Sequence, residues 1–305
     1  MGASPPGKPP PRPSGEALPL LLFQTFEESL VCKLKSLNPT SSGNGGGEGP
    51  AASFPYLSRA VGVLSSAHRL LESLFSDPFL SGSDEAAVAA YLGDSLRLLD
   101  LCNSLSEEIQ RLRRGRLLLL FAVQLLSSPT PTKVRKAREV LNQWEGSSSG
   151  RLVLRLTRRE APVTPLGRAV YAVEAVSALV AGFWVSSLGG GAAHLAAVAE
   201  VPREFPWAKA FNELRAAALS CSVGGWPAEG VDAAVRRLSQ IITEPAREEE
   251  QLRSSVKELA RATEGLTEGL DSLGGAAESL FRGVLRVRNT ALQGYRLLPK
   301  KCSIK

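Results

Sequence analysis

Residues 83–126 read SDEAAVAAYLGDSLRLLDLCNSLSEEIQRLRRGRLLLLFAVQLL, and this stretch decides the predicted fold. Apolar side chains recur every three or four residues along it, and no proline interrupts the run. This spacing predicts one long amphipathic helix. Ser83 can cap its first turn, and the helix has to end before Pro129. At 1.5 Å per residue it would be about 65 Å long, so other long helices must lie along its apolar stripe.

A second stripe of similar length lies near the end of the sequence. Between Leu252 and Ala291, apolar or small residues are spaced four and three apart, which is the heptad pattern of a coiled coil. A shorter stripe from Val231 to Ile242 precedes it. We expect 252–291 to pair with the 83–126 helix of the same chain, because that helix otherwise lacks a partner of its own length. Self-association of two chains through 252–291 is the alternative.

The composition and the remaining segments predict an all-α protein. Of the residues, 44% are hydrophobic and only 6% aromatic, and runs of β-branched residues are scarce. We expect an elongated bundle of long antiparallel helices with one apolar central helix, and shorter helices at about 16–37, 55–75, 131–144 and 205–220. The predicted organisation is a disordered proline-rich tail (1–15), a single helical domain (16–298) and a basic tail (299–305). The domain would contain a flexible Gly/Ser linker (38–53), a basic linker (145–168), an apolar segment (169–200) and a heptad-patterned region (228–294).

The apolar segment is either a buried helix or a membrane contact. No Asp, Glu, Lys or Arg occurs between Glu174 and Glu200, and three glycines at 189–191 interrupt the segment. Its uninterrupted apolar run, 175–188, is shorter than the roughly 20 residues that a membrane-spanning helix needs. This length favours a buried bundle helix, while a single span or a hairpin in one leaflet stays open. The candidate residues are Val176, Leu179, Val180, Phe183, Trp184, Val185 and Leu188.

Positive charge is concentrated in the middle of the chain. Between Arg111 and Arg168 there are thirteen Lys and Arg residues against three Glu residues. Such a block can face an anionic membrane surface, nucleic acid or an acidic partner, or form an ordinary solvated face. Nucleic acid is the disfavoured partner, because no known binding motif and no interleaved aromatic residues accompany the arginines. The candidate contacts are Arg111, Arg113, Arg114, Arg116, Arg151, Arg155, Arg158 and Arg159.

No catalytic or metal-binding pattern is visible. There is no P-loop, dinucleotide fingerprint, GxSxG or HExxH motif. The two histidines, His68 and His194, are far apart, and we expect His68 to be a hydrogen-bonded core residue. The four cysteines are also widely separated, as in a reduced intracellular protein. The sequence therefore predicts no enzyme activity, no cofactor and no metal site.

Four stretches resemble the plant BYPASS family. They are YLSRAVGVLSSAHRLLESL (56–74), LLDLCNSLSEEIQRLRRGRLLL (98–119), AVYAVEAVSALVAGFWVSSLGG (169–190) and VPREFPWAKAFNELR (201–215). The resemblance extends from about Leu18 to Leu297. The glycine run at 43–49 and Glu174 within the apolar stretch depart from the family pattern.

This resemblance implies a non-enzymatic plant regulator of growth and development. In that family the founding member is associated with restraining a mobile, root-derived signal that arrests shoot growth. Relatives are linked to secretion through the exocyst, so an adaptor in secretion is the alternative, and a basic nucleic-acid-binding helical protein is a third reading. The protein would act by binding an unidentified protein partner near a membrane. Its expected location is intracellular, either cytoplasmic or membrane-associated, with the plastid as the alternative.

Overall fold

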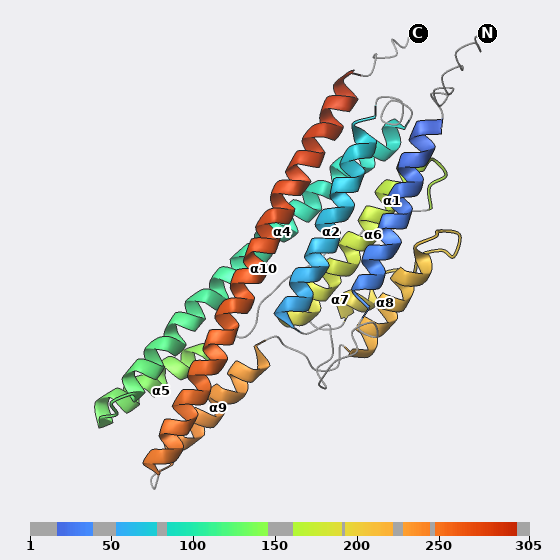
Figure 1. Ribbon diagram of the computed structural model, residues 1–305. Helices are drawn as coiled ribbons and strands as arrows, with labels where there is room; N and C mark the ends of the chain where they lie inside the picture. Colours follow the sequence, from blue (N-terminus) through green and yellow to red (C-terminus); the bar gives the residue numbers. More distant parts are fainter. Residues whose placement is uncertain are drawn as a thin grey trace, which may run out of the picture.

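The fold is an elongated bundle of helices (Figure 1). The computed structural model describes residues 17–38, 53–77, 84–145, 161–190, 193–221, 228–244 and 248–297. Within these ranges there are helices and turns but no β-strand. The all-α prediction is therefore confirmed. The predicted tails at 1–15 and 299–305 lie outside the described residues, as do 39–52 of the Gly/Ser linker and 146–160 of the basic linker.

Two long antiparallel helices form the spine of the bundle. They are α4 (Glu85–Leu126) and α10 (Glu249–Leu297), which pack against each other within the chain. The predicted long helix is thus confirmed, but its cap differs from the expectation. The carboxylate of Asp84 accepts a hydrogen bond from the backbone N–H of Ala87 at 2.8 Å, which satisfies one free donor of the first turn. Ser83 lies outside the described residues.

The heptad stripe of α10 is buried along its whole length. Its successive positions from Leu252 to Ala291 are all buried, and Thr263, the polar member, donates its hydroxyl hydrogen bond to the carbonyl oxygen of Leu259 at 2.7 Å. The stripe contacts α9 (Glu229–Thr243), α4 and α2 (Phe54–Phe75). The pairing within one chain is confirmed, and self-association through 252–291 stays a prediction.

A close approach between α2 and α10 depends on a glycine. The Phe54 side chain, at the start of α2, lies against Gly269 of α10, and a Cβ added at Gly269 would be 2.6 Å from Phe54 Cγ and 2.8 Å from Phe54 Cβ. Both distances are well inside van der Waals contact. Gly275, on the same helix, has no heavy atom within 4 Å of the equivalent position. Only the first of these two glycines is required by packing.

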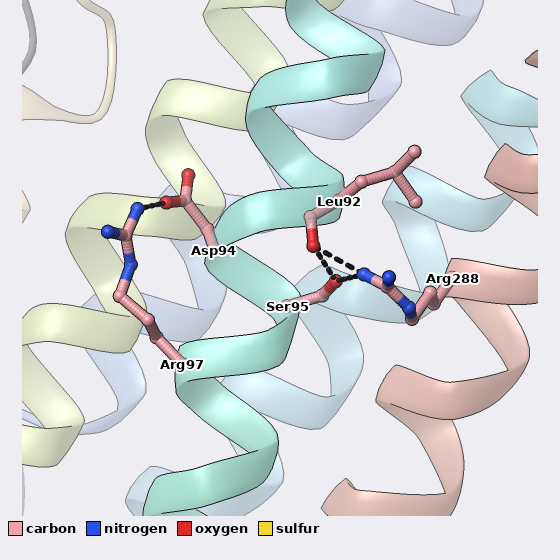
Figure 2. Close-up of polar contacts among 5 residues, drawn as sticks. All are labelled: Leu92, Asp94, Ser95, Arg97 and Arg288. Atoms are coloured by element: carbon pink, nitrogen blue, oxygen red, sulfur yellow. Dashed lines mark hydrogen bonds and ion pairs between the residues drawn. The ribbon is translucent and has the colours of Figure 1, made fainter.

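One arginine ties α10 to the backbone of α4 (Figure 2). Nη1 of Arg288 donates to the carbonyl oxygen of Leu92 and to Oγ of Ser95, the latter at 2.7 Å. Asp94 and Arg97 lie on the other side of α4, where they form an ion pair. Ser95 is almost completely buried, so the Arg288 contact supplies a hydrogen bond in a place that water does not reach.

At one end of the molecule, two shorter helices complete a four-helix arm (Figure 1). These are α5 (Pro131–Glu145) and α9, which pack beside the C-terminal half of α4 and the N-terminal part of α10. Trp144 of α5 joins three of them. Its ring lies against Gly115 of α4, and its Nε1 donates to Oδ1 of Asp232 on α9 at 2.8 Å.

The other end of the molecule holds the remaining helices. These are α1 (Ala17–Ser36), α2, α6 (Pro165–Val185), α7 (Ala193–Ala196) and α8 (Ala208–Cys221), with one π-helical turn, Ser186–Gly190, after α6. Pro165 begins α6, so the last four residues of the predicted basic linker are helical instead. Arg168 forms an ion pair with Glu27 at 3.2 Å and lies over the Phe205 ring. These contacts connect α6 to α1 and to the segment before α8.

His68 is a buried, hydrogen-bonded core residue, as predicted. It lies on α2, and its Nδ1 is 3.2 Å from the hydroxyl oxygen of Tyr91 on α4. Burial lowers the pKa of His68 from 6.5 to about 3, because the charged imidazolium would lose its hydration. The ring is therefore neutral at physiological pH.

We expect Gly269→Ala to destabilise the fold and Gly275→Ala to stabilise it. The first change forces Phe54 to move and should lower the free energy of unfolding by about 1–3 kcal/mol. The second only restricts the unfolded chain and should raise that free energy by about 0.5–1 kcal/mol. Urea unfolding followed by circular dichroism measures both. Equal effects of the two substitutions would show that the Phe54 contact does not constrain residue 269.

We also expect His68 to make stability fall in mild acid. Below pH 6.5 the unfolded chain binds a proton at His68 that the folded chain excludes until its pKa of about 3. The stability is therefore complete above pH 6.5 and decreases as the pH falls through the window between these values. Between pH 7 and pH 5, the wild type should lose about 2 kcal/mol more than His68→Gln. Urea unfolding at both pH values gives this difference, and identical losses in the two proteins would contradict it.

Candidate functional site

The predicted arginine cluster on α4 is largely engaged within the bundle. Arg113 donates to Oδ1 of Asp271 on α10 at 2.8 Å, and Arg116 donates to Oγ1 of Thr267 at 2.8 Å. Arg111 pairs with Glu108 on its own helix, with a Nε to Oε2 distance of 2.9 Å. Arg113 and Arg116 link α4 to α10, whereas the Arg111 contact lies within α4. Arg114 is the exposed member of the cluster.

The other four predicted arginines belong to the predicted basic linker. Arg151, Arg155, Arg158 and Arg159 lie outside the described residues. Helix α5 supplies a different set of cations close to the end of α4. Lys133 donates to the carbonyl oxygen of Ser128 at 3.2 Å, and Arg138 donates to Thr243 at 2.5 Å. The Lys133 contact is local to the turn between α4 and α5, whereas the Arg138 contact reaches α9.

Exposed apolar side chains lie beside the exposed cations. Leu117, Leu120 and Phe121 of α4 are 56%, 42% and 41% exposed. The ammonium group of Lys136 on α5 lies 5.3 Å from the centre of the Phe121 ring, which is a cation–π distance. Arg114, Leu117 and Phe121 share one face of α4, because they are three and then four residues apart.

We call Arg114, Leu117, Leu120, Phe121 and Lys136 the hairpin surface. The segment that carries this surface is basic, since residues 109–138 contain eight Lys and Arg residues and no Asp or Glu. Sequence reasoning missed its apolar members. The run LLLLF at 117–121 indicates these exposed apolar residues in the sequence. Consecutive helical residues point in different directions around the axis, so a single buried stripe cannot hold five of them.

The seven candidate residues of the apolar segment are all in the core. Val176, Leu179, Val180, Phe183, Trp184 and Val185 lie on α6, and Leu188 lies in the following π-helical turn. The ring of Phe183 packs 5.7 Å from that of Tyr56 on α2, measured between centres. Residues 165–188 form the one described helix that is long and apolar enough to cross a membrane, and 67% of its most apolar window is buried inside the fold. This burial agrees with the bundle-helix interpretation.

The described residues offer little nucleophilic or metal-binding chemistry. Burial raises the pKa of the Cys102 thiol to about 12, so this thiol stays protonated. No group of three or more His, Cys, Asp or Glu side chains comes together as a metal site within the described ranges.

Comparisons with known proteins identify plant relatives. UPF0496 protein 4 of Oryza sativa subsp. japonica is 29% identical over 261 residues, covering 75% of this chain and 56% of the relative. The protein of the same name from subsp. indica is 29% identical over 243 residues, covering 72% of this chain and 52% of the relative. "Protein BPS1, chloroplastic" of Arabidopsis thaliana is 28% identical over 221 residues, covering 66% of this chain and 61% of the relative.

The chain spans about half to three fifths of the length of these curated relatives. No protein-family model and no solved structure matches it. The four sequence motifs lie on α2, on α4, on α6 with its π-helical turn, and on α8 with the segment before it. The comparisons therefore support a BYPASS-like plant family for this chain.

Proposed function

We propose that this chain is a non-enzymatic plant growth regulator that acts by binding, with the hairpin surface as its contact to an anionic membrane. The observation that carries the proposal is the exposure of Leu117, Leu120 and Phe121 beside Arg114 and Lys136. Exposed leucines occur singly on many soluble proteins. Three large apolar side chains flanked by cations are typical of a surface that meets a lipid interface or a partner.

The physical basis is the combination of two attractions. Leucine and phenylalanine side chains gain free energy when they leave water for the boundary between headgroups and acyl chains. Each Lys or Arg near an anionic leaflet adds about 1 kcal/mol. The hairpin surface lies near one end of the elongated bundle, where α4 meets α5 (Figure 1). A flat membrane can approach this end while the other helices extend away from it.

The regulatory role is supported by the BYPASS-like relatives. The resemblance implies restraint of a root-derived signal, with secretion through the exocyst as the alternative. One relative carries "chloroplastic" in its name, which keeps the plastid as the alternative location for this chain. Since the chain spans only part of its relatives, the role of the whole protein is included in the proposal.

We expect wild-type protein to bind phosphatidylglycerol vesicles and the double variant Leu117→Asp/Phe121→Asp to lose at least about tenfold in affinity. The substitutions replace apolar contacts with charges that an anionic surface repels. Vesicle co-flotation at low salt measures the affinity. The matched control is Leu96→Asp/Leu285→Asp, which changes two exposed leucines far from the hairpin and should bind like the wild type.

The charge contribution is tested separately. Arg114→Glu/Lys136→Glu should reduce flotation strongly. The control Arg203→Glu/Lys209→Glu changes the net charge equally but lies on and beside α8, away from the hairpin surface, and should float like the wild type. Both control positions are exposed. The membrane proposal fails if wild type does not float with anionic vesicles, or if each variant floats as well as its control.

We expect high salt to release the expressed protein from isolated plant membranes. The apolar segment is buried in the bundle, so the contact with lipid should be peripheral and dependent on charge. Fractionation with a high-salt wash followed by an alkaline carbonate wash measures the release. Protein that resists both washes would show that 175–188 is inserted in the membrane.

A further inference from the structure

A cavity of about 820 Å³ lies between α4, α6 and the segment that connects α7 to α8. His68 of α2 and Phe211 of α8 also line it. The volume falls in the range of small-molecule sites in proteins, roughly 300–1,000 Å³. The cavity borders residues 91–101 of α4, about 20 residues before the apolar part of the hairpin surface, so the two sites are distinct.

Small apolar side chains leave this space open. Alanine is the commonest lining residue, and Ala175, Ala178 and Ala181 place three of them on one face of α6. Two more, Ala196 and Ala197, contribute from the end of α7 and the residue after it. Such a lining accepts an apolar molecule. A row of small residues can also result from close packing of helices. The polar groups of the cavity are therefore the evidence for a ligand.

His68 supplies a polar atom in need of a partner. It is 2% exposed and lines the cavity. Its Nδ1 is occupied by the Tyr91 hydroxyl group, while its Nε2 is buried and has no hydrogen-bond partner among the described residues. A buried polar atom left without a partner costs about 1–3 kcal/mol. A ligand that bonds to Nε2 would recover that free energy.

The electrostatics of the cavity favour an uncharged ligand. The His68 ring is neutral, since burial holds its pKa near 3. Both arginines of the wall are engaged with the protein. Arg97 pairs with Asp94 at 2.5 Å (Figure 2), and Arg215 donates to the carbonyl oxygen of Val198 at 2.6 Å and to Glu200 at 3.2 Å. A charged ligand would have to break these pairs or remain uncompensated.

We propose that this cavity binds an uncharged, mostly apolar small molecule through a hydroxyl or carbonyl group that hydrogen-bonds to Nε2 of His68. The role of Nε2 depends on the direction of the His68–Tyr91 hydrogen bond. Nε2 is a donor when the Tyr91 hydroxyl group donates to Nδ1, and it is an acceptor when Nδ1 donates to Tyr91. A hydroxyl group suits both cases and a carbonyl group suits the first. The small side chains of α6 and α7 contact the apolar body of the ligand.

Two fluorescent probes of matched size test the proposal on the full chain. They are 1-pyrenemethanol, which carries a hydroxyl group, and 1-methylpyrene, which lacks it. Wild type should bind both, with the alcohol about five- to tenfold tighter, as expected for one buried hydrogen bond. His68→Phe should remove that preference and leave the affinity for 1-methylpyrene unchanged.

A second pair of variants locates the binding. Ala178→Phe should fill the cavity and lower the affinity for both probes at least about tenfold, while Ala89→Phe, on an exposed face of α4, should bind like the wild type. If Ala178→Phe does not fold, as judged by circular dichroism, Ala178→Leu takes its place. The proposal is overturned if wild type binds neither probe, if His68→Phe preserves the preference for the alcohol, or if the cavity-filling variant binds like its control. Each of these outcomes is independent of vesicle binding.

Discussion

The whole bundle depends on the burial of one continuous stripe along α10. The stripe begins at Leu252 and reaches Ala291 without an exposed position, and it packs in turn against α9, α4 and α2. An isolated helix of this length could not keep such a surface in water. Because α10 contacts helices at both ends of the molecule, its stripe joins the four-helix arm to the other end in one core.

Helix α4 packs against different helices at its two ends. Near its start it packs against α6 and α10, and Tyr91 contacts His68 and Phe75 of α2. Tyr91 and Cys102 are both buried there. Towards its end, α5 and α10 are the only described helices that contact it closely, and part of its surface is exposed. The thinner arm is stabilised by Trp144, whose ring and indole nitrogen contact α4 and α9. The exposure of Leu117 and Phe121 follows from this change in the number of neighbours.

Much of this architecture could be predicted from the order of residues, because helical periodicity reports directly which face is buried. The limits of α4 and α10, the pairing of their stripes and the burial of His68 all follow from local spacing. The roles of single polar residues do not. Arg113 and Arg116 were grouped with Arg114 as a charged surface, yet Asp271 and Thr267 accept hydrogen bonds from them across the α4–α10 interface. Only the tertiary pairing reveals which charges are already engaged.

The cavity could not be predicted for a related reason. Its lining is drawn from helices that are distant in sequence, and alanines at regular spacing read as ordinary helix packing. A glycine inside a helix such as α10 is expected only to weaken that helix. The structure gives Gly269 a packing role against Phe54, while Gly275 is open. The sequence shows that a glycine lowers helix stability, but it does not show which neighbouring side chain leaves no room for a Cβ atom.

The Arg288 contact has a consequence for the register of the two long helices. A heptad pattern matches itself again after seven residues, so a slip of about 10 Å would keep most apolar contacts of α10. The ion pair at Arg113 would tolerate such a slip, because Glu264 and Glu278 lie seven residues to either side of Asp271. The Leu92 carbonyl group would instead meet Phe281 or Tyr295, and Phe54 would meet Ala262 or Ala276. One arginine and one glycine therefore select a single alignment from several that the apolar stripe alone would allow.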